Sequence, residues 1–507
     1  MSGLAGLAFL VPLLPLLGAA GIAAHLLAGG ADGDEGERPT ARLAEGTAFL
    51  AFLLAAAIGG AAIVAGPPGA ASMGRWFAAG DVVLSLTLAL DGAALAFSAL
   101  TGFVGWMTIR FSVRYLHRED GFHRFFLAMG LFLGGMQCIV LGGNALVVFV
   151  GWELCGVSSW LLIAYARERP AATGNANHAF VANRIGDAGF LLGIALATLW
   201  LGTLEWEGFA AWTRAPDFDK VSSRLLLFGF LLAAVAKSAQ LPFSAWIARA
   251  LEGPTPSSAI FYGAIMVHAG VWLVIRLQPV LLATPDIMFY LAVIGLFTAV
   301  YGALAGLVQT DVKSALVFGT TTQVGLMFLA CGLGWFQVAT WHLCLHAAWR
   351  SWQFLAAPSY MHLAGRAPPA PKWLARRGRL YAAALQRFWI DAAGQALLAR
   401  PVQRFGRDLA DLDDRVLSHL VGMPGGSATD RAEEDDVIRA HGLPGRMLLW
   451  IADRLQNFET RLILRGGGGP MTRALREFGR AFLVVEEMLE QPRYLLLALA
   501  ATFVVIL

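Results

Sequence analysis

The sequence predicts an all-α, polytopic membrane protein with about twelve transmembrane helices, one of them discontinuous, and amphipathic helices at the membrane surface. Of its 507 residues, 57% are hydrophobic and only 14% are charged, whereas about a quarter are charged in ordinary soluble domains. The charges are also uneven, because 35 of the 73 Asp, Glu, Lys and Arg residues lie within 366–490. These observations exclude a soluble enzyme, a nucleic-acid-binding protein and a simple pore.

The spans follow from length, since a bilayer core about 30 Å thick needs about 20 apolar helical residues. This rule predicts spans at 4–27, 47–65, 82–109, 125–141, 145–166, 179–201, 225–250, 257–277, 287–308, 314–333, 337–362 and 494–507. The first segment lacks a basic start and a clear cleavage site, so we expect it to be a retained span and not a signal peptide. The last segment has only fourteen residues and needs flanking residues to reach across the bilayer.

Charge divides the chain into four predicted regions. Residues 1–81 form an N-terminal transmembrane hairpin with loops, and 82–365 form a membrane core. Residues 366–490 form a charged amphipathic segment, and 491–507 form a C-terminal transmembrane helix. Arginines cluster after the third, fifth and eleventh predicted spans, so the positive-inside rule places the N-terminus outside and the charged tail in the cytoplasm.

The charged tail contains helical patterns. In 388–421, apolar residues recur every three to five positions while arginine and aspartate occupy the other face. Similar stretches occur at 447–464 and 472–489, separated by glycine-rich or acidic loops. We expect these amphipathic helices to lie on lipid or on other helices and to serve as a strut or docking surface.

Ionisable residues inside predicted spans are the main functional candidates, because they are costly in a bilayer and mark ion pathways. They are Asp91, Glu153, Asp187, Lys237, His268, His342, His346 and Arg350, with Lys313 at the start of a span. Arginine is the usual base in this chain, which has only four lysines. A lysine at position 237 therefore indicates proton transfer, since a buried lysine can release its proton and an arginine cannot.

Pro242 lies five residues after Lys237 and removes a backbone donor within the same span. We expect a broken helix there, with free carbonyls near Lys237 that can solvate an ion or water; a simple kink is the alternative. Glu153 needs a cation, and Lys237 is the expected partner, although a static buried pair is also possible. Asp187, beside Arg184, is expected near the membrane surface in a structural or functional role.

His342, His346 and Arg350 recur every four residues and therefore share one helix face. A ladder of this kind suits a hydrated proton relay, because histidine titrates near neutral pH. A metal site is not expected, since no nearby cysteine or carboxylate completes a ligand set. His268 is either a core histidine or a member of the relay. The four cysteines lie in apolar stretches without metal-ligand spacing.

Five motifs in the core resemble the antiporter-like subunits of respiratory complex I and Mrp antiporters, in collinear order from about Leu90 to His362. They are GWELCGVSSWLL, NRIGDAGFLLG, AKSAQLPFSAWIARALEGPTPSSA, DVKSALVFGTTTQVGLMFLA and HLCLHAAWRSWQFLA. The resemblance implies that 82–365 is a proton-conducting core, with Glu153 and Lys237 as a coupled pair. It also implies that Asp187 matches the acidic residue of the next helix, and that Lys313, His342 and His346 match a central hydrophilic axis.

The chain also departs from this family. The family commonly has histidine at the position of Tyr262 and lysine at the position of Arg350, and no second discontinuous helix with its own lysine follows His362. This layout, with EGPTPSSAIFYGA, is more similar to the membrane subunit of DAB-type inorganic carbon transporters. That resemblance implies a multi-pass protein of the bacterial inner membrane that is a transporter subunit and not itself an enzyme.

The same resemblance implies a large cytoplasmic partner, similar to a β-carbonic anhydrase, that carries zinc and hydrates CO2 to bicarbonate. We expect this chain to carry no cofactor and to contact lipid. We also expect proton flux through it to drive the partner's reaction. Two alternatives remain open: a complex I-like or Mrp-like ion-translocating subunit, and a non-conducting membrane anchor for a soluble enzyme. The transported ion, H⁺ or Na⁺, also remains open.

Overall fold

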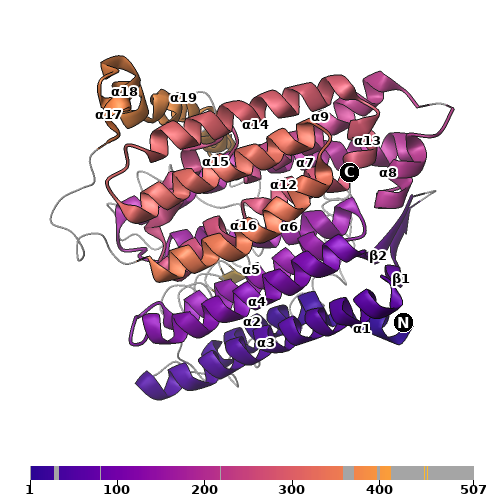
Figure 1. Ribbon diagram of the computed structural model, residues 1–507. Helices are drawn as coiled ribbons and strands as arrows, with labels where there is room; N and C mark the ends of the chain where they lie inside the picture. The colour runs from indigo at the N-terminus through magenta and orange to yellow at the C-terminus, as the bar shows by residue number, and fades with distance from the viewer. Residues whose placement is uncertain are drawn as a thin grey trace.

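The computed structural model describes residues 2–27, 33–79, 82–216, 218–357, 370–396 and 400–412, together with 450, 451 and 454. Long helices lie side by side in one bundle, and a β-hairpin stands at the end opposite α17 and α18 (Figure 1). The predicted all-α polytopic membrane fold is confirmed, with one small two-stranded sheet as the exception.

The first half of the bundle contains eight helices. They are α1 (Ser2–Leu7), α2 (Leu10–Leu27), α3 (Gly33–Ala65), α4 (Gly92–Tyr115), α5 (Phe122–Leu141), α6 (Ala145–Ile163), α7 (Pro170–Leu201) and α8 (Trp206–Trp212).

The second half begins with a discontinuous helix and ends in three long helices. Its elements are α9 (Lys220–Lys237), α10 (Ala245–Arg249), η1 (Ala250–Glu252), α11 (Thr255–Ser258), η2 (Ala259–Ala264), α12 (His268–Arg276), α13 (Gln278–Leu282), α14 (Pro285–Gly306), α15 (Val312–Gly332) and α16 (Phe336–Ala356). The tail adds α17 (Lys372–Ala375), α18 (Gly378–Leu385), η4 (Arg387–Trp389), α19 (Ile390–Gly394) and α20 (Arg400–Leu412).

Nine helical stretches in the described part of the chain are long and apolar enough to cross a membrane. The pair α9–α10 and the helix α16 account for two further predicted spans, so each of the eleven spans predicted between residues 4 and 362 overlaps at least one helix, the span at 82–109 only from Gly92 onward. The span at 494–507 and the helices expected at 447–464 and 472–489 lie outside the described residues, apart from positions 450, 451 and 454. The four predicted regions remain a prediction.

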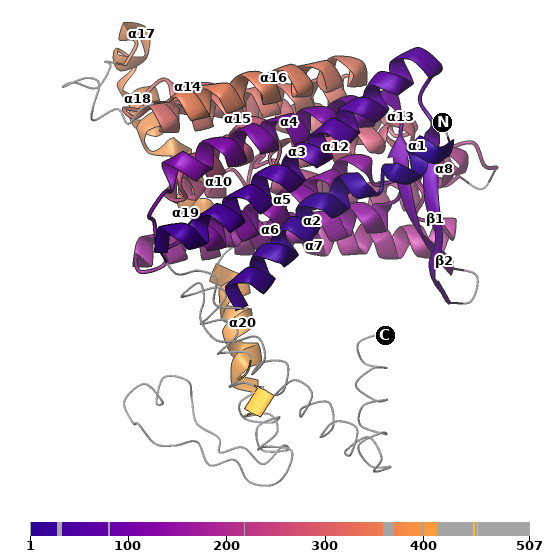
Figure 2. The same cartoon turned by 90° about the horizontal axis from the view of Figure 1, so that it is seen from below.

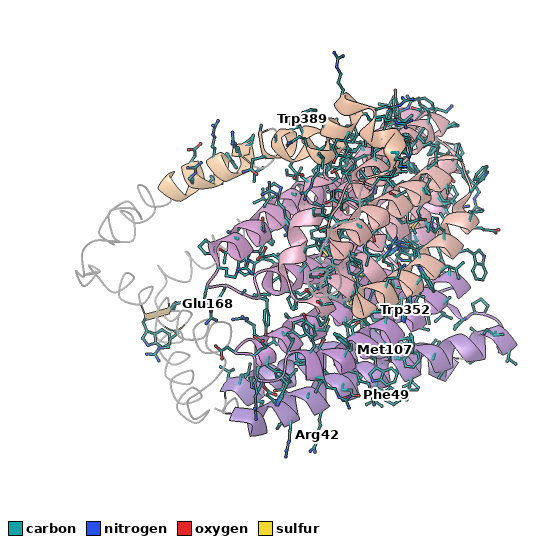
Figure 3. All side chains as sticks on the ribbon, turned by 60° about the vertical axis from the view of Figure 1, so that its left-hand side comes forward. Arg42, Phe49, Met107, Glu168, Trp352 and Trp389 are labelled. Atoms are coloured by element: carbon teal, nitrogen blue, oxygen red, sulfur yellow. The ribbon has the colours of Figure 1, made fainter. Side chains whose placement is uncertain are left out.

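The outer surface of the bundle is apolar. On α16, large side chains that are mostly exposed include Trp341, Leu345, Trp349 and Trp352. Figure 3 labels Trp352, and Met107 on α4, which is also exposed. A surface of this composition suits contact with lipid tails, because a bilayer does not penalise exposed apolar groups.

The prediction of one continuous span at 82–109 is wrong. Residues 82–90 form strand β2 (Val82–Leu90), which pairs antiparallel with β1 (Gly69–Ala79) from Gly69 opposite Leu90 to Ala79 opposite Val82. Hydropathy over a window cannot separate an apolar strand from an apolar helix. Asp91 is consequently not a charge in the middle of a span: it is the N-cap of α4, where its Oδ1 accepts a hydrogen bond from the Ala94 N–H at 2.9 Å.

The discontinuous helix predicted from Pro242 is confirmed. Helix α9 begins after Asp219, whose pKa is held below its ordinary value by hydrogen bonds from Ser222. It ends at Lys237, and residues 238–244 are not helical before α10 begins. Two carbonyls near the break already have donors: Trp246 Nε1 donates to the Ala236 carbonyl at 2.9 Å, and Gln240 Nε2 donates to the Ser238 carbonyl at 2.9 Å.

Close contact between α7 and α9 brings the charged residues of these helices together. The two helices approach at paired glycines, because a Cβ atom added to Gly229 would lie only 2.7 Å from the carbonyl oxygen of Gly189. Small residues allow helix backbones to approach in this way within a membrane. Helix α7 also starts at Pro170, earlier than the predicted span at 179, so Asp187 lies in the middle of a long helix.

The tail returns to the bundle through α17, α18 and α19, and α20 then leads away from it (Figure 2). Helix α20 exposes Val402, Phe405 and Leu409, as expected for one apolar face. The prediction of a single helix from Phe388 is wrong, because Arg387, Phe388 and Trp389 have positive φ angles of 48°, 54° and 53°. Residues 413–421 of that predicted helix lie outside the described residues.

Candidate functional site

Lys237 occupies the last position of α9, at the break of the discontinuous helix. It is 1% exposed, its Nζ donates to the Trp152 carbonyl at 3.2 Å, and Nζ lies 5.1 Å from the centroid of the Trp152 ring. An ammonium group so deeply buried needs nearby negative charge or partial negative charge. The carbonyl and the ring face of Trp152 supply part of it.

Arg184 on α7 holds two carboxylates. It forms a very short ion pair with Glu153 on α6 and a second ion pair with Asp187, in which Arg184 Nη2 lies 2.6 Å from Oδ2. Within the described residues, Glu153 and Lys237 form no direct ion pair, so the expected pairing is wrong. Arginine takes that place because α6 and α7 lie side by side and its fork reaches both carboxylates.

Asp187 is buried inside the bundle, at 3% exposed, and its expected place near the membrane surface stays a prediction. Its Oδ1 accepts a hydrogen bond from Trp152 Nε1 at 2.7 Å. Trp152 therefore links the two sides of the site: its indole N–H binds Asp187, and its backbone carbonyl binds Lys237. Two carboxylates, one guanidinium and one ammonium form a charge cluster, defined here as Glu153, Arg184, Asp187 and Lys237.

Gly156 makes room for this cluster. A Cβ atom there would lie 2.7 Å from Arg184 Nη2 and 3.8 Å from Lys237 Nζ. Both cations therefore lie against the same small residue of the GWELCG motif. A larger side chain would displace the guanidinium.

A second group, the histidine ladder, is defined by His268, His346, His342 and Arg350. His268 Nε2 and His346 Nδ1 are 2.9 Å apart, and Arg350 Nε donates to His346 Nε2 at 3.4 Å. Since His346 Nε2 accepts from arginine, we assign the His346 proton to Nδ1, from which it is donated to His268. The rings of His342 and His346 are 6.2 Å apart.

The ladder confirms the predicted shared face of α16 and brings His268 into contact with His346, while a relay role for His268 stays a prediction. His342 Nε2 also lies 2.8 Å from Gln323 Oε1 on α15. Sequence reasoning missed this glutamine. It equally missed Trp152 and the bridging role of Arg184, although the spacing of Arg184 and Asp187 by three helical residues was a usable signal.

Lys313 and Tyr262 lie outside these two groups. Lys313 Nζ donates to Thr255 Oγ1 at 2.6 Å, and Thr255 Oγ1 is 3.0 Å from the Tyr115 hydroxyl. Tyr262 is fully buried with its ring 5.4 Å from that of Phe354, and its hydroxyl has no hydrogen-bond partner within the described structure. No group of three His, Cys, Asp or Glu side chains suited to a metal occurs among the described residues.

The fold and these two groups define a class: a polytopic membrane protein with ionisable residues buried around a broken helix. Two family models match the chain. Residues 142–368 match "NADH:quinone oxidoreductase/Mrp antiporter, TM", and residues 76–126 match "NADH-Ubiquinone oxidoreductase (complex I), chain 5 N-terminus". The membrane core of this chain therefore belongs to the antiporter-like family of membrane subunits that complex I and Mrp complexes share.

Curated relatives support the same family assignment. The chain is 37% identical over 291 residues to NADH-quinone oxidoreductase subunit L of Campylobacter jejuni, which covers 57% of this chain and 48% of the relative. It is 37% identical over 325 residues to NAD(P)H-quinone oxidoreductase subunit 5 of Paulinella chromatophora, covering 62% and 47%. The chain thus spans about half the length of the curated relatives it matches.

Solved structures share the fold. A chain of the Mrp complex from Dietzia sp. matches with a TM-score of 0.58 and 23% identity, covering 98% of this chain and 63% of that chain. A chain of an archaeal membrane-bound sulfane sulfur reductase matches with a TM-score of 0.57 and 20% identity, covering 68% and 55%.

Proposed function

We propose that this chain conducts protons across the membrane, with Lys237 as the switching carrier. The observation that carries the proposal is the position of Lys237: a fully buried ammonium at the break of a discontinuous helix, next to the Arg184 ion pairs. Lysine can give up a proton in such a site, whereas arginine stays charged. Arg184 therefore acts as a fixed positive charge beside a variable one.

The charge cluster offers a way to control that proton. Arg184 can strengthen its contact with Glu153 or with Asp187, and each shift changes the negative charge available to Lys237. When the carboxylates are drawn toward Arg184, the ammonium loses compensation and releases its proton. When Asp187 is released, the ammonium is favoured again.

The histidine ladder supplies a route away from the charge cluster. Helix α12, which carries His268, packs on α9, and the Ser238 hydroxyl next to Lys237 donates to the Val267 carbonyl at 2.6 Å. His268, His346 and His342 then form an ordered series of imidazoles that can each accept a proton on one ring nitrogen and donate from the other. Lys313 joins the axis from the end of the bundle that carries the tail.

The test is proton flux into proteoliposomes containing the purified full chain, followed with an internal pH-sensitive dye. Lys237→Ala should abolish flux. Lys220→Ala is the matched control, because Lys220 is the exposed first residue of the same helix. Full flux in the Lys237→Ala protein, at equal incorporation, would contradict the assignment.

We further propose that the flux energises inorganic carbon accumulation with a cytoplasmic zinc-dependent partner similar to a β-carbonic anhydrase. The partner would convert CO2 and water into bicarbonate and a proton, and the membrane subunit would make this hydration one-way. The proposal is supported by the passage of the sequence from α16 directly into the charged segment 366–490, and by the EGPTPSSAIFYGA motif. The charged segment would dock the partner.

Co-purification in mild detergent distinguishes the candidates. One large zinc protein supports carbon accumulation, whereas redox or multiple antiporter subunits support the complex I-like or Mrp-like alternative, which the curated relatives favour. In cells, Lys237→Ala and Glu153→Gln should abolish bicarbonate accumulation while the protein stays in the membrane. Normal accumulation in both variants would instead indicate a non-conducting anchor.

A further inference from the structure

The tail contributes a segment to the bundle that the proposed proton axis does not include. We define the return segment as residues 387–395, formed by η4, α19 and the residue after it. Phe388 and Ile390 pack against the same buried cluster as Leu241 of the helix break, a cluster formed by Tyr301, Ala305 and Phe318. The Phe388 ring lies 6.1 Å from that of Tyr301 on α14. A Cβ atom on Gly394 would lie 3.5 Å from the Cβ of Ala245.

This packing brings a carboxyl group to the tail-side end of the broken helix. Asp391 Oδ2 pairs with Arg387 Nη1 at 3.1 Å, and the Asp391 side chain is 27% exposed. Its other oxygen, Oδ1, is buried and makes no hydrogen bond within the described structure. One face of the carboxyl group therefore meets solvent and a cation, while the other faces the protein interior.

Polar groups of the bundle face this carboxyl group. Tyr301 lies within electrostatic range of Asp391 and beside Ser244, the last residue before α10. His178 on α7 is also within electrostatic range of Asp391 and lies next to Gln395. The charged and titratable neighbours of Asp391 are thus Arg387, Tyr301 and His178, and Arg249 is a neighbour of His178.

The break at 238–244 contains two further buried polar atoms without hydrogen-bond partners among the described residues. Ser244 Oγ and Gln240 Oε1 are both buried and have no hydrogen-bond partner in the described part of the chain. Both belong to the break at 238–244, which connects α10 to Lys237. An unsatisfied buried polar atom costs about 1–3 kcal/mol, and ordered water normally removes that cost. Buried water in proteins typically binds polar atoms of this kind.

We propose that Asp391 is a proton-carrying residue that connects the tail-side solvent to Lys237 through the break at 238–244. The inference rests on the proposed proton conduction. A proton taken from solvent converts the Asp391 carboxylate to the acid, and the acid passes it to water beside Ser244 and Gln240 and returns to the carboxylate. Lys237 receives the proton as its amine becomes an ammonium. The positive charge of Arg387 stabilises the deprotonated Asp391 carboxylate.

The first experiment measures proton flux in proteoliposomes of the full chain. Asp391→Asn should lower flux by at least about tenfold, which corresponds to about 1.4 kcal/mol of added barrier. Asp391→Glu should retain most of the flux, because it keeps a titratable carboxyl group. The matched control is Asp408→Asn on α20, whose side chain is exposed and removed from the break. If Asp391→Asn conducts like the wild type, the inference is overturned while proton conduction stands.

The second experiment does not depend on flux. Dicyclohexylcarbodiimide modifies protonated carboxyl groups in apolar surroundings, and mass spectrometry of the labelled full chain locates the adduct. We expect an adduct on Asp391 and none on Asp408. If the wild type shows no flux, the proposed function and this inference both fail. If the wild type conducts and Asp391 stays unlabelled, the inference is overturned while proton conduction stands.

Discussion

The charge cluster and the histidine ladder both bury ionisable side chains within the bundle, but they stabilise them in opposite ways. In the cluster, two carboxylates face a guanidinium and an ammonium, so the formal charges of Glu153, Arg184, Asp187 and Lys237 balance. In the ladder, neutral imidazoles are joined by hydrogen bonds, and Arg350 lies at one end. Burying charge requires a partner for each ion, whereas a chain of neutral donors and acceptors needs only correct tautomers.

The difference indicates a division of roles. The cluster stores charge, and its state depends on which carboxylate Arg184 contacts. The ladder stores little charge and is suited to passing a proton along. If that comparison is right, changes in the cluster should affect stability and flux together, whereas changes in the ladder should affect flux far more than stability.

The largest effect is expected from Arg184→Gln. It leaves two carboxylates against one ammonium, and breaking a buried ion pair by removing one partner costs about 3–5 kcal/mol. The exposed part of Glu153 lowers that figure, because its side chain is 30% exposed. Thermal unfolding in detergent should show a reduced Tm, together with loss of flux.

The double variant Arg184→Gln with Glu153→Gln restores formal neutrality and serves as the control for the preceding prediction. It should recover most of the lost Tm without recovering flux. A double variant as unstable as Arg184→Gln alone would mean that packing, and not charge balance, explains the effect.

A smaller effect on stability, but a large one on flux, is expected from His346→Ala. This change removes the hydrogen bonds to His268 and Arg350, each worth about 0.5–1.5 kcal/mol of net stability. Flux should fall by at least about tenfold, because the relay loses its central member. His117→Ala, at an exposed surface pair with Glu37, should keep normal flux. Loss of stability as large as in Arg184→Gln would break the comparison.

The smallest effect is expected from Tyr262→Phe. The Tyr262 hydroxyl is buried without a hydrogen-bond partner in the described structure, so its removal should be neutral or slightly stabilising. Both Tm and flux should match the wild type. Reduced flux would place Tyr262 on the proton path and extend the ladder toward α11.

Much of the site could be predicted from local sequence. The broken helix followed from a proline five residues after a lysine, and the shared face of His342, His346 and Arg350 followed from helical periodicity. The partner of Glu153 could not be predicted in this way. Glu153 and Arg184 are 31 residues apart, and only the packing of α6 against α7 decides which cation reaches the carboxylate first.

The sequence by itself determined that most of this chain is helical membrane protein, because composition and span length are local properties of the chain. It also determined which residues are costly to bury. Only the tertiary structure decided that residues 82–90 pair as a strand and that His268 meets His346 across 78 residues. It also decided that the return segment packs against the same buried cluster as Leu241 of the helix break. Such contacts depend on which helix faces meet in the bundle, and periodicity along a single helix carries no information about its neighbours.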